Sequence, residues 1–148
     1  SMSDSPMSCV LLADRHHGLT EGMRGLLETA FGTVVMVADE ASLLEGAVRL
    51  RPDLAVVDVS LARGSGLDWL RELRQRCPDL KVIVLSVHDE ESVRCAAIEA
   101  GADAFVLKRT IATDLLPAVD AVRSGQSVEK TTDEGRPTSN RTPSPPVR

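Results

Sequence analysis

Four polar residues occur where short apolar runs of the sequence end, and their side chains could together handle a phosphoryl group. They are Asp14, Asp58, Ser86 and Lys108. A carboxylate can attack phosphorus and form an acyl phosphate when a cation neutralises the phosphoryl oxygens. We therefore assign Asp58 as the candidate nucleophile, and Asp14 as a residue that helps to hold Mg²⁺, a cation that prefers oxygen ligands. The Ser86 hydroxyl and the Lys108 ammonium would contact the remaining phosphoryl oxygens.

These four residues come together if the chain folds into a parallel sheet. Five apolar runs with strand character occur at residues 9–13, 33–38, 54–58, 81–86 and 104–107. Segments with helical periodicity alternate with them, at residues 19–30, 42–50, 67–77, 90–100 and 115–122. Parallel neighbours need a crossover helix, so the pattern predicts an α/β fold with a doubly wound, five-stranded parallel sheet. Such sheets bind ligands at the carboxyl ends of their strands, where the four polar residues stand.

Local signals predict where some helices begin and which faces they bury. Ser42 and Glu45 have the spacing of a capping box that opens the second helix. Val48 is expected on the apolar face of that helix, and Ala96 on the apolar face of the fourth. Pro117 either lies in the first turn of the last helix or bends it.

Composition limits the classes of protein to which the chain can belong. Of the 148 residues 43% are hydrophobic but only 2% aromatic, which favours α/β packing over a sandwich rich in aromatic residues. The net charge of −5 argues against a general nucleic-acid binder. No signal peptide and no apolar run of about 18 residues occur, so we expect a soluble, cytoplasmic protein without membrane contact. Cys9, Cys77 and Cys95 form no Cys-x-x-Cys pair and are expected to be buried thiols in a reducing compartment.

The sequence also suggests domain boundaries. Residues 1–8 are expected to be a tag-cleavage scar and an N-terminal arm, and residues 9–125 form one domain. Residues 126–148 are rich in Ser, Thr and Pro and lack periodicity, which is typical of a disordered tail or an interdomain linker.

With these motifs in view, the chain resembles the receiver domains of two-component response regulators, of the LuxR-type (NarL/FixJ-like) subfamily. The resemblance covers about residues 9–125. It rests on Leu-Leu-Ala-Asp-Arg-His at 11–16, Arg-Pro-Asp-Leu-Ala-Val-Val-Asp at 51–58, Val-Leu-Ser at 84–86 and Gly-Ala-Asp-Ala-Phe-Val-Leu-Lys at 101–108. It implies a flavodoxin-like (βα)5 receiver fold with strand order 2-1-3-4-5.

The resemblance implies that Asp58 is the phosphoacceptor and that a histidine kinase is its donor. The metal ligands would be Asp14, the first residue of the family's acidic pair, Asp58 and the backbone carbonyl of Ser60. Lys108 would contact the phosphoryl group. The chain would not be an enzyme beyond catalysing its own phosphorylation and dephosphorylation.

The resemblance also implies a switch and an output. Ser86 would be the switch hydroxyl, and Phe105 the aromatic residue that fills the space vacated when Ser86 moves inward. The surface of the fourth helix, fifth strand and fifth helix would then change shape and control an output, expected to be transcription. The partners implied are the kinase, a second copy in a homodimer, and DNA only through an output domain absent from this chain.

Two departures from the family's pattern stand near the site. Arg15 occupies the place of the usual second acid, and Leu61-Ala62-Arg63 replaces the usual Met-Pro-Gly of the loop after Asp58. We hypothesise that Arg15 places a guanidinium where the cation would sit, which would weaken Mg²⁺ binding and partly mimic it.

Other interpretations remain open. A pseudo-receiver that signals by protein contact without phosphorylation is consistent with Arg15. A phosphatase with an Asp nucleophile would need an acid at position 60, where the chain has Ser60. His16 and His17 could bind metal or relay phosphate, although a loop cap is the preferred interpretation. The arginines of the third helix are expected on a solvated face rather than in a basic patch; they are Arg71, Arg74 and Arg76.

Overall fold

The computed structural model describes residues 8–64 and 66–125, without the side chains of residues 17–19. Its centre is one sheet of five parallel strands in the order β2-β1-β3-β4-β5. The strands are β1 (Cys9–Ala13), β2 (Thr33–Val37), β3 (Leu54–Asp58), β4 (Lys81–Ser86) and β5 (Ala104–Leu107). The predicted fold class and strand order are confirmed.

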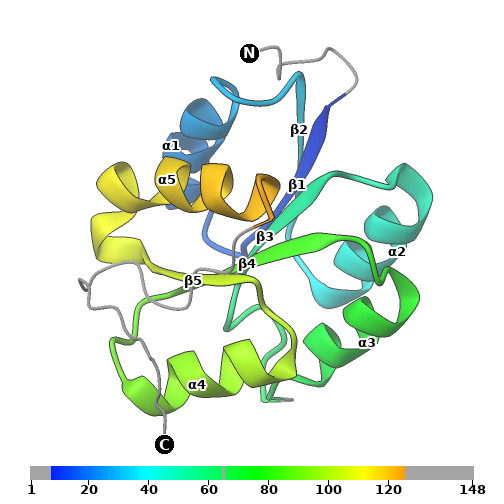
Figure 1. Cartoon of the computed structure of the whole chain (residues 1–148), viewed down its shortest axis with the longest axis vertical. Coiled ribbons are helices and arrows are strands. Elements are labelled where there is room, and N and C mark those ends of the chain that lie inside the picture. Colours follow the sequence, from blue (N-terminus) through cyan, green and yellow to red (C-terminus); the bar gives the residue numbers. More distant parts are fainter. Residues whose placement is uncertain (1–7, 65, 126–148) are drawn as a thin grey trace, which may run out of the picture.

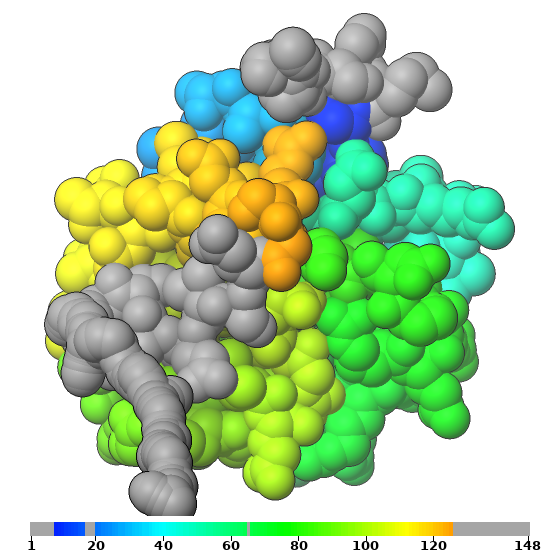
Figure 2. All heavy atoms as spheres, viewed as in Figure 1, coloured from blue at the N-terminus to red at the C-terminus, as the bar shows by residue number. Residues whose placement is uncertain are grey.

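The helices form a layer on each face of the sheet, because each crossover between parallel strands must pass over one face. They are α1 (His17–Leu27), α2 (Glu40–Leu50), α3 (Asp68–Arg76), α4 (Glu91–Ala100), the short 3-10 helix η1 (Lys108–Thr110) and α5 (Ile111–Arg123). Helices α1 and α5 cover one face, and α2, α3 and α4 cover the other (Figure 1). In the space-filling view, α5 (yellow to orange) and α2 with α3 (cyan to green) lie on opposite sides of the visible surface (Figure 2).

Alternating side chains of the central strands supply the two halves of the core. In β1, Val10 and Leu12 pack toward α1 and α5, whereas Leu11 and Ala13 pack toward α2 and α3. All five residues of β3 are buried because helices cover both faces of the sheet at its centre. A strand buried on both faces explains why the sequence of β3 is continuously apolar up to Asp58.

The start of α2 differs from the capping-box prediction. The helix begins at Glu40, and the side chain of Asp39 accepts a hydrogen bond of 2.8 Å from the backbone N–H of Ser42. Asp39 is therefore the N-cap, and Ser42 lies inside the first turn. The apolar face was also predicted too wide, since Val48 is 49% exposed.

Three further expectations about side chains and helices change. Ala96 of α4 is exposed, because only one narrow stripe of that helix meets the sheet. Pro117 lies inside α5 and not in its first turn. Cys9 and Cys77 are partly buried, but Cys95 is exposed, so the buried-thiol prediction is wrong for Cys95. Burial, together with the nearby Asp53 carboxylate, raises the pKa of the Cys9 thiol.

The solvated-face prediction for α3 is wrong for one of its three arginines. Arg74 is largely buried and donates hydrogen bonds to the backbone oxygens of Gly101 at 3.0 Å and Leu80 at 2.6 Å. It also pairs with Asp103 at 2.8 Å, and the same carboxylate oxygen accepts a hydrogen bond from the N–H of Val82. Arg74 thus connects α3 to the segments before β4 and β5.

The predicted N-terminal arm, apart from residue 8, and the predicted tail at 126–148 lie outside the described residues. Within the part of the chain that is described, none of the helices combines the length and apolar character needed to cross a membrane.

Candidate functional site

The register of the sheet brings the two predicted carboxylates together. Ala13 of β1 pairs with Val57 of β3, so Asp14 and Asp58 come next on neighbouring strands. Lys108 follows β5 directly, at the same edge of the sheet. The order of the strands reverses between β1 and β3, which is where doubly wound sheets form their binding crevice.

A buried ammonium joins the two carboxylates. Lys108 Nζ lies 2.8 Å from Asp14 Oδ2 and 3.2 Å from Asp58 Oδ2. Asp14 and Asp58 are each 2% exposed and Lys108 is 7% exposed. Asp14 Oδ2 is close to the ammonium but accepts no hydrogen bond of acceptable geometry. Charges this buried are stable only when they are paired, so the three groups form one electrostatic unit.

His16 belongs to this site, although metal binding was the less favoured of the two interpretations that the sequence allowed for it. Its backbone N–H donates to Asp14 Oδ1 at 2.8 Å, and its Nδ1 lies 3.1 Å from the same oxygen. Nδ1 is also 3.6 Å from Asp58 Oδ2. His16 is the N-cap residue of α1, but its side chain makes no capping hydrogen bond, so the loop-cap interpretation is wrong for the imidazole. An available signal was its spacing two residues after Asp14, where a carboxylate commonly binds the backbone of its own turn.

The guanidinium of Arg15 does not occupy the position that we hypothesised for it. Among the described residues, the basic groups within ion-pair distance of the two carboxylates are those of His16 and Lys108. Arg15 is partly exposed beside them. The His16 imidazole therefore lies within ion-pair distance of both carboxylates, where the hypothesis expected the Arg15 guanidinium.

The loop after β3 fixes the Asp58 carboxylate. Ser60 donates from its hydroxyl to Asp58 Oδ2 at 2.9 Å and from its backbone N–H to Oδ1 at 3.2 Å. Leu61 and Ala62 are 3% and 7% exposed, so this unusual loop sequence packs into the core. The Ser60 carbonyl as a metal ligand stays a prediction.

Ser86 ends β4 and Phe105 lies in β5, close to the edge of the sheet that carries the site. In the described part of the chain, the Ser86 hydroxyl makes no hydrogen bond with Asp14 or Asp58. The Ser86 hydroxyl donates to the backbone oxygen of His88 at 3.2 Å and accepts from the His88 N–H at 2.9 Å. Phe105 is 4% exposed and packs in the core on the side of α2, α3 and α4. The hydroxyl is therefore engaged in its own loop, and the aromatic ring is already inside.

The residues at this edge fit a divalent cation. One ligand atom each from Asp14, His16 and Asp58 lie within 4.8 Å of one another. The two carboxylates are ligands that Mg²⁺ accepts, and Asp14 Oδ1 faces His16 while Lys108 contacts Oδ2. Asp14 and Asp58 would therefore hold the ion.

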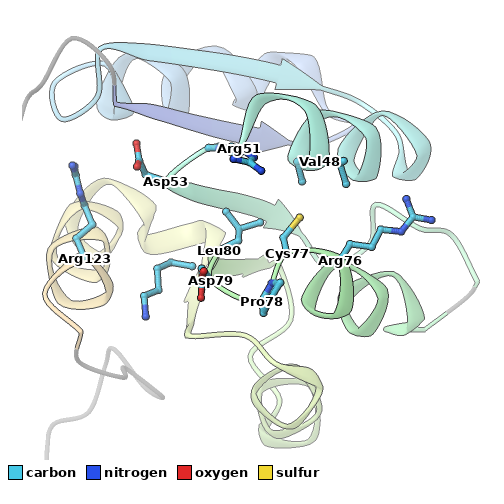
Figure 3. Close-up of a pocket in the computed structure, with 12 residues that line it drawn as sticks. Val48, Arg51, Asp53, Arg76, Cys77, Pro78, Asp79, Leu80 and Arg123 are labelled. Carbon is cyan, nitrogen blue, oxygen red and sulfur yellow. The ribbon is translucent and has the colours of Figure 1, made fainter.

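A hollow lies at the opposite end of the sheet, and its lining includes none of the residues Asp14, His16, Asp58 and Lys108. It has a volume of about 700 Å³ and lies between the end of α2 and the end of α3. Arg51 and Val48 face Cys77 and Arg76 across it (Figure 3). Its lining mixes acidic, basic and apolar side chains without convergent polar groups.

Comparison with known proteins agrees with this geometry. The family model described as response regulator receiver domain matches residues 10–120. The transcriptional regulatory protein DegU of Brevibacillus brevis is 33% identical over 118 residues, which cover 78% of this chain and 50% of the relative. The nitrate/nitrite response regulator protein NarP of Escherichia coli (strain K12) is 36% identical over 121 residues, covering 80% and 56%. The chain thus spans about half the length of the curated relatives that it matches.

Solved structures show the same architecture. A LuxR-family two-component response regulator from Aurantimonas sp. SI85-9A1 has a TM-score of 0.78 at 25% identity, covering 84% of this chain and 90% of that chain. A signal receiver domain from Mycobacterium tuberculosis has a TM-score of 0.71 at 28% identity, covering 80% and 98%. The residues that the family model matches include most of the described sheet and the paired Asp14, Asp58 and Lys108. The chain therefore belongs to the response regulator receiver domain family.

Proposed function

We propose that the chain is a phosphoacceptor receiver that takes a phosphoryl group on Asp58 from a histidine kinase. The observation that carries the proposal is the buried ammonium of Lys108, 2.8 Å from Asp14 and 3.2 Å from Asp58. An ammonium beside a carboxylate nucleophile can neutralise an incoming phosphoryl oxygen, which a carboxylate would otherwise repel.

In the proposed transfer, an oxygen of Asp58 forms a bond to phosphorus while the bond from phosphorus to the donor atom breaks. The donor leaves with the electron pair of that bond, and Asp58 becomes an acyl phosphate. Lys108 holds one phosphoryl oxygen, and Ser60 keeps the carboxylate oriented through the two hydrogen bonds it donates. The Asp58 side chain is 3% exposed, so a donor reaches it only after neighbouring groups such as His16 have shifted.

A divalent cation, when bound at Asp14, Asp58 and the Ser60 carbonyl, supplies further neutralisation of the phosphoryl oxygens. Mg²⁺ fits the carboxylates and is the cation that we propose for this step.

The proposed response starts at Ser86. To donate to a phosphoryl group on Asp58, its hydroxyl must give up the hydrogen bond that it donates to the His88 backbone oxygen. This exchange moves the loop between β4 and α4, and Phe105 repacks beside it, so the α4-β5-α5 surface changes. Phe105 is already buried, which limits its part to a shift within the core.

A pseudo-receiver that signals by protein contact without phosphorylation is the second candidate. Arg15 in place of the usual second acid favours it. A phosphatase finds less support, because Ser60 offers a hydroxyl and no acid at the position where that chemistry needs one.

The wider assignment follows from the relatives, several of which are transcriptional regulators by name. We propose that residues 9–125 act as the receiver and that residues 126–148 link it to an output domain, through which the protein regulates transcription in the cytoplasm. A homodimer through the α4-β5-α5 or α1-α5 surface would transmit the signal. Beyond its own phosphorylation and dephosphorylation, the receiver would catalyse no reaction.

Incubation with acetyl phosphate and Mg²⁺, followed by intact-protein mass spectrometry, tests the proposal. A single phosphate adduct is expected on the wild-type chain and no adduct on Asp58→Asn, whose amide cannot form an acyl phosphate. Absence of an adduct over the whole Mg²⁺ range would instead support the pseudo-receiver.

A further inference from the structure

We propose that His16 is a direct metal ligand at this site, and that the site consequently prefers a divalent transition-metal ion such as Mn²⁺ to Mg²⁺. The inference rests on the proposed function in that it concerns the same cation position. It goes beyond that function because it assigns His16 as a ligand and, from the imidazole nitrogen, a divalent transition metal as the favoured ion.

Spacing of the candidate ligand atoms supports the assignment. His16 Nδ1 lies 3.1 Å from Asp14 Oδ1 and 3.6 Å from Asp58 Oδ2. Neighbouring ligands of a cation with bonds of about 2.1 Å are separated by about 3.0 Å in an octahedron and about 3.4 Å in a tetrahedron. One cation could therefore bind all three atoms after small side-chain adjustments.

The buried site has one negative charge more than Lys108 can compensate, which favours binding of a cation. Asp14 and Asp58 carry two negative charges when ionised, and Lys108 supplies one positive charge. At Asp14 the ammonium contacts Oδ2 and the imidazole contacts Oδ1, whereas at Asp58 both groups lie nearest to Oδ2. A cation beside the imidazole would compensate the remaining charge, with Lys108 kept on Asp14 Oδ2 and Asp58 Oδ2 shared.

The donor types determine which cation is favoured. Mg²⁺ keeps oxygen ligands and several waters, while imidazole nitrogen suits first-row transition metals and Mn²⁺ also accepts carboxylates. The His16 side chain is 56% exposed, so its other ring nitrogen can carry the proton in water while Nδ1 presents its lone pair to the metal.

Titration with Mn²⁺, followed by electron paramagnetic resonance, tests this inference on the full chain. The loss of the free Mn²⁺ signal gives its affinity, and competition with Mg²⁺ gives the affinity for that ion. Electron spin-echo envelope modulation of the bound Mn²⁺ detects a nitrogen atom that is coordinated to it. We expect a ¹⁴N modulation in the wild type that changes to ¹⁵N after labelling with [¹⁵N]histidine, and Mn²⁺ binding tighter than Mg²⁺ binding.

Variants separate the imidazole from the carboxylates. His16→Ala and His16→Gln should each lose the nitrogen modulation and weaken Mn²⁺ binding at least about tenfold, the lower end of what loss of a supporting group costs a metal site. Mg²⁺ binding should change less than the Mn²⁺ affinity. Glu45→Ala, which removes an exposed carboxylate of α2 remote from the site, is the matched control and should match the wild type. Circular dichroism of each variant establishes that it is folded.

Two results would overturn the inference. One is bound Mn²⁺ without nitrogen modulation in the wild type, and the other is equal loss of Mn²⁺ and Mg²⁺ affinity in both His16 variants. Either result leaves phosphorylation of Asp58 by acetyl phosphate untouched, and absence of that adduct in turn leaves nitrogen coordination measurable. The two proposals therefore fail separately.

Discussion

At the scale of single residues, the distinctive feature is a lysine buried between two carboxylates. Lys108, Asp14 and Asp58 are almost fully buried and mutually paired. Removing one partner of a buried ion pair leaves an uncompensated charge in a region of low dielectric constant, which costs far more than the loss of a surface pair. The two carboxylates also repel each other, so the lysine and the acids have opposite effects on stability.

Lys108→Met should lower the free energy of unfolding by about 3–5 kcal/mol, because it leaves both buried carboxylates without the ammonium. Asp58→Asn should leave the free energy unchanged or raise it, since it removes the repulsion from Asp14 and keeps the shape of the side chain. Urea unfolding followed by circular dichroism measures both effects.

The double variant provides the control for that experiment. Asp58→Asn should restore part of the stability lost in Lys108→Met, because only one carboxylate then remains unpaired. A double variant whose free energy of unfolding equals the sum of the two single effects would contradict the view that the three charges form one unit.

At the scale of elements, Arg74 holds α3 against the segments that precede β4 and β5. Its guanidinium satisfies the backbone oxygens of Leu80 and Gly101 and the carboxylate of Asp103. Gly101 has φ of +121°, and a Cβ at this position would lie 2.6 Å from Arg74 Cγ. The glycine therefore both ends α4 and admits the arginine.

Arg74→Ala should lower the free energy of unfolding by about 2 kcal/mol, because partly buried acceptors lose their donor. Arg71→Ala is the matched control on the same helix. Its exposed pair with Asp68 should contribute no more than about 0.5 kcal/mol. Thermal or urea unfolding compares the two, and similar effects of both substitutions would argue against the connecting role.

The N-cap of α2 predicts a dependence of stability on pH. The hydrogen bonds from Ser42 to Asp39 lower the pKa of this carboxyl group in the folded chain. A group whose pKa is lower in the folded than in the unfolded chain stabilises the fold above its unfolded pKa of about 3.9, and that contribution is lost as the pH falls through the lower folded value.

The difference in urea midpoint between wild type and Asp39→Ala should therefore be constant between about pH 5 and 7 and shrink below about pH 4. Asp39→Asn keeps an acceptor that does not titrate, and its midpoint relative to Asp39→Ala should not show this decrease. A wild-type difference that stays constant however far the pH falls below the unfolded pKa of about 3.9 would exclude the cap as its source.

At the scale of the whole molecule, the strand order places the site. Alternating apolar runs and helical segments were sufficient to predict the parallel sheet, and strand-end positions were sufficient to bring Asp14, Asp58 and Lys108 to one edge. The sequence left metal binding at His16 as the less favoured interpretation because the turn after β1, and not periodicity, directs its ring. Arg74 escaped because its partners are distant in sequence and meet it only in the folded chain.

The prediction that Val48 is buried was wrong because the fold leaves its side of α2 uncovered. Val48 has the helical spacing of a core residue but is half exposed, because none of the described helices or strands packs over that side of α2. Such apolar spacing predicts that a helix forms, but the neighbours of the helix decide how wide a face it buries.

Asp58 as the phosphoacceptor is tested most directly by locating the acyl phosphate on the chain. The protein is treated with acetyl phosphate and a divalent cation and reduced with borohydride, which converts a phosphorylated Asp to homoserine, and its peptides are then sequenced by mass spectrometry. We expect homoserine at position 58 alone, and none there when acetyl phosphate is omitted. Homoserine at another aspartate, or at no aspartate, would contradict the assignment of Asp58.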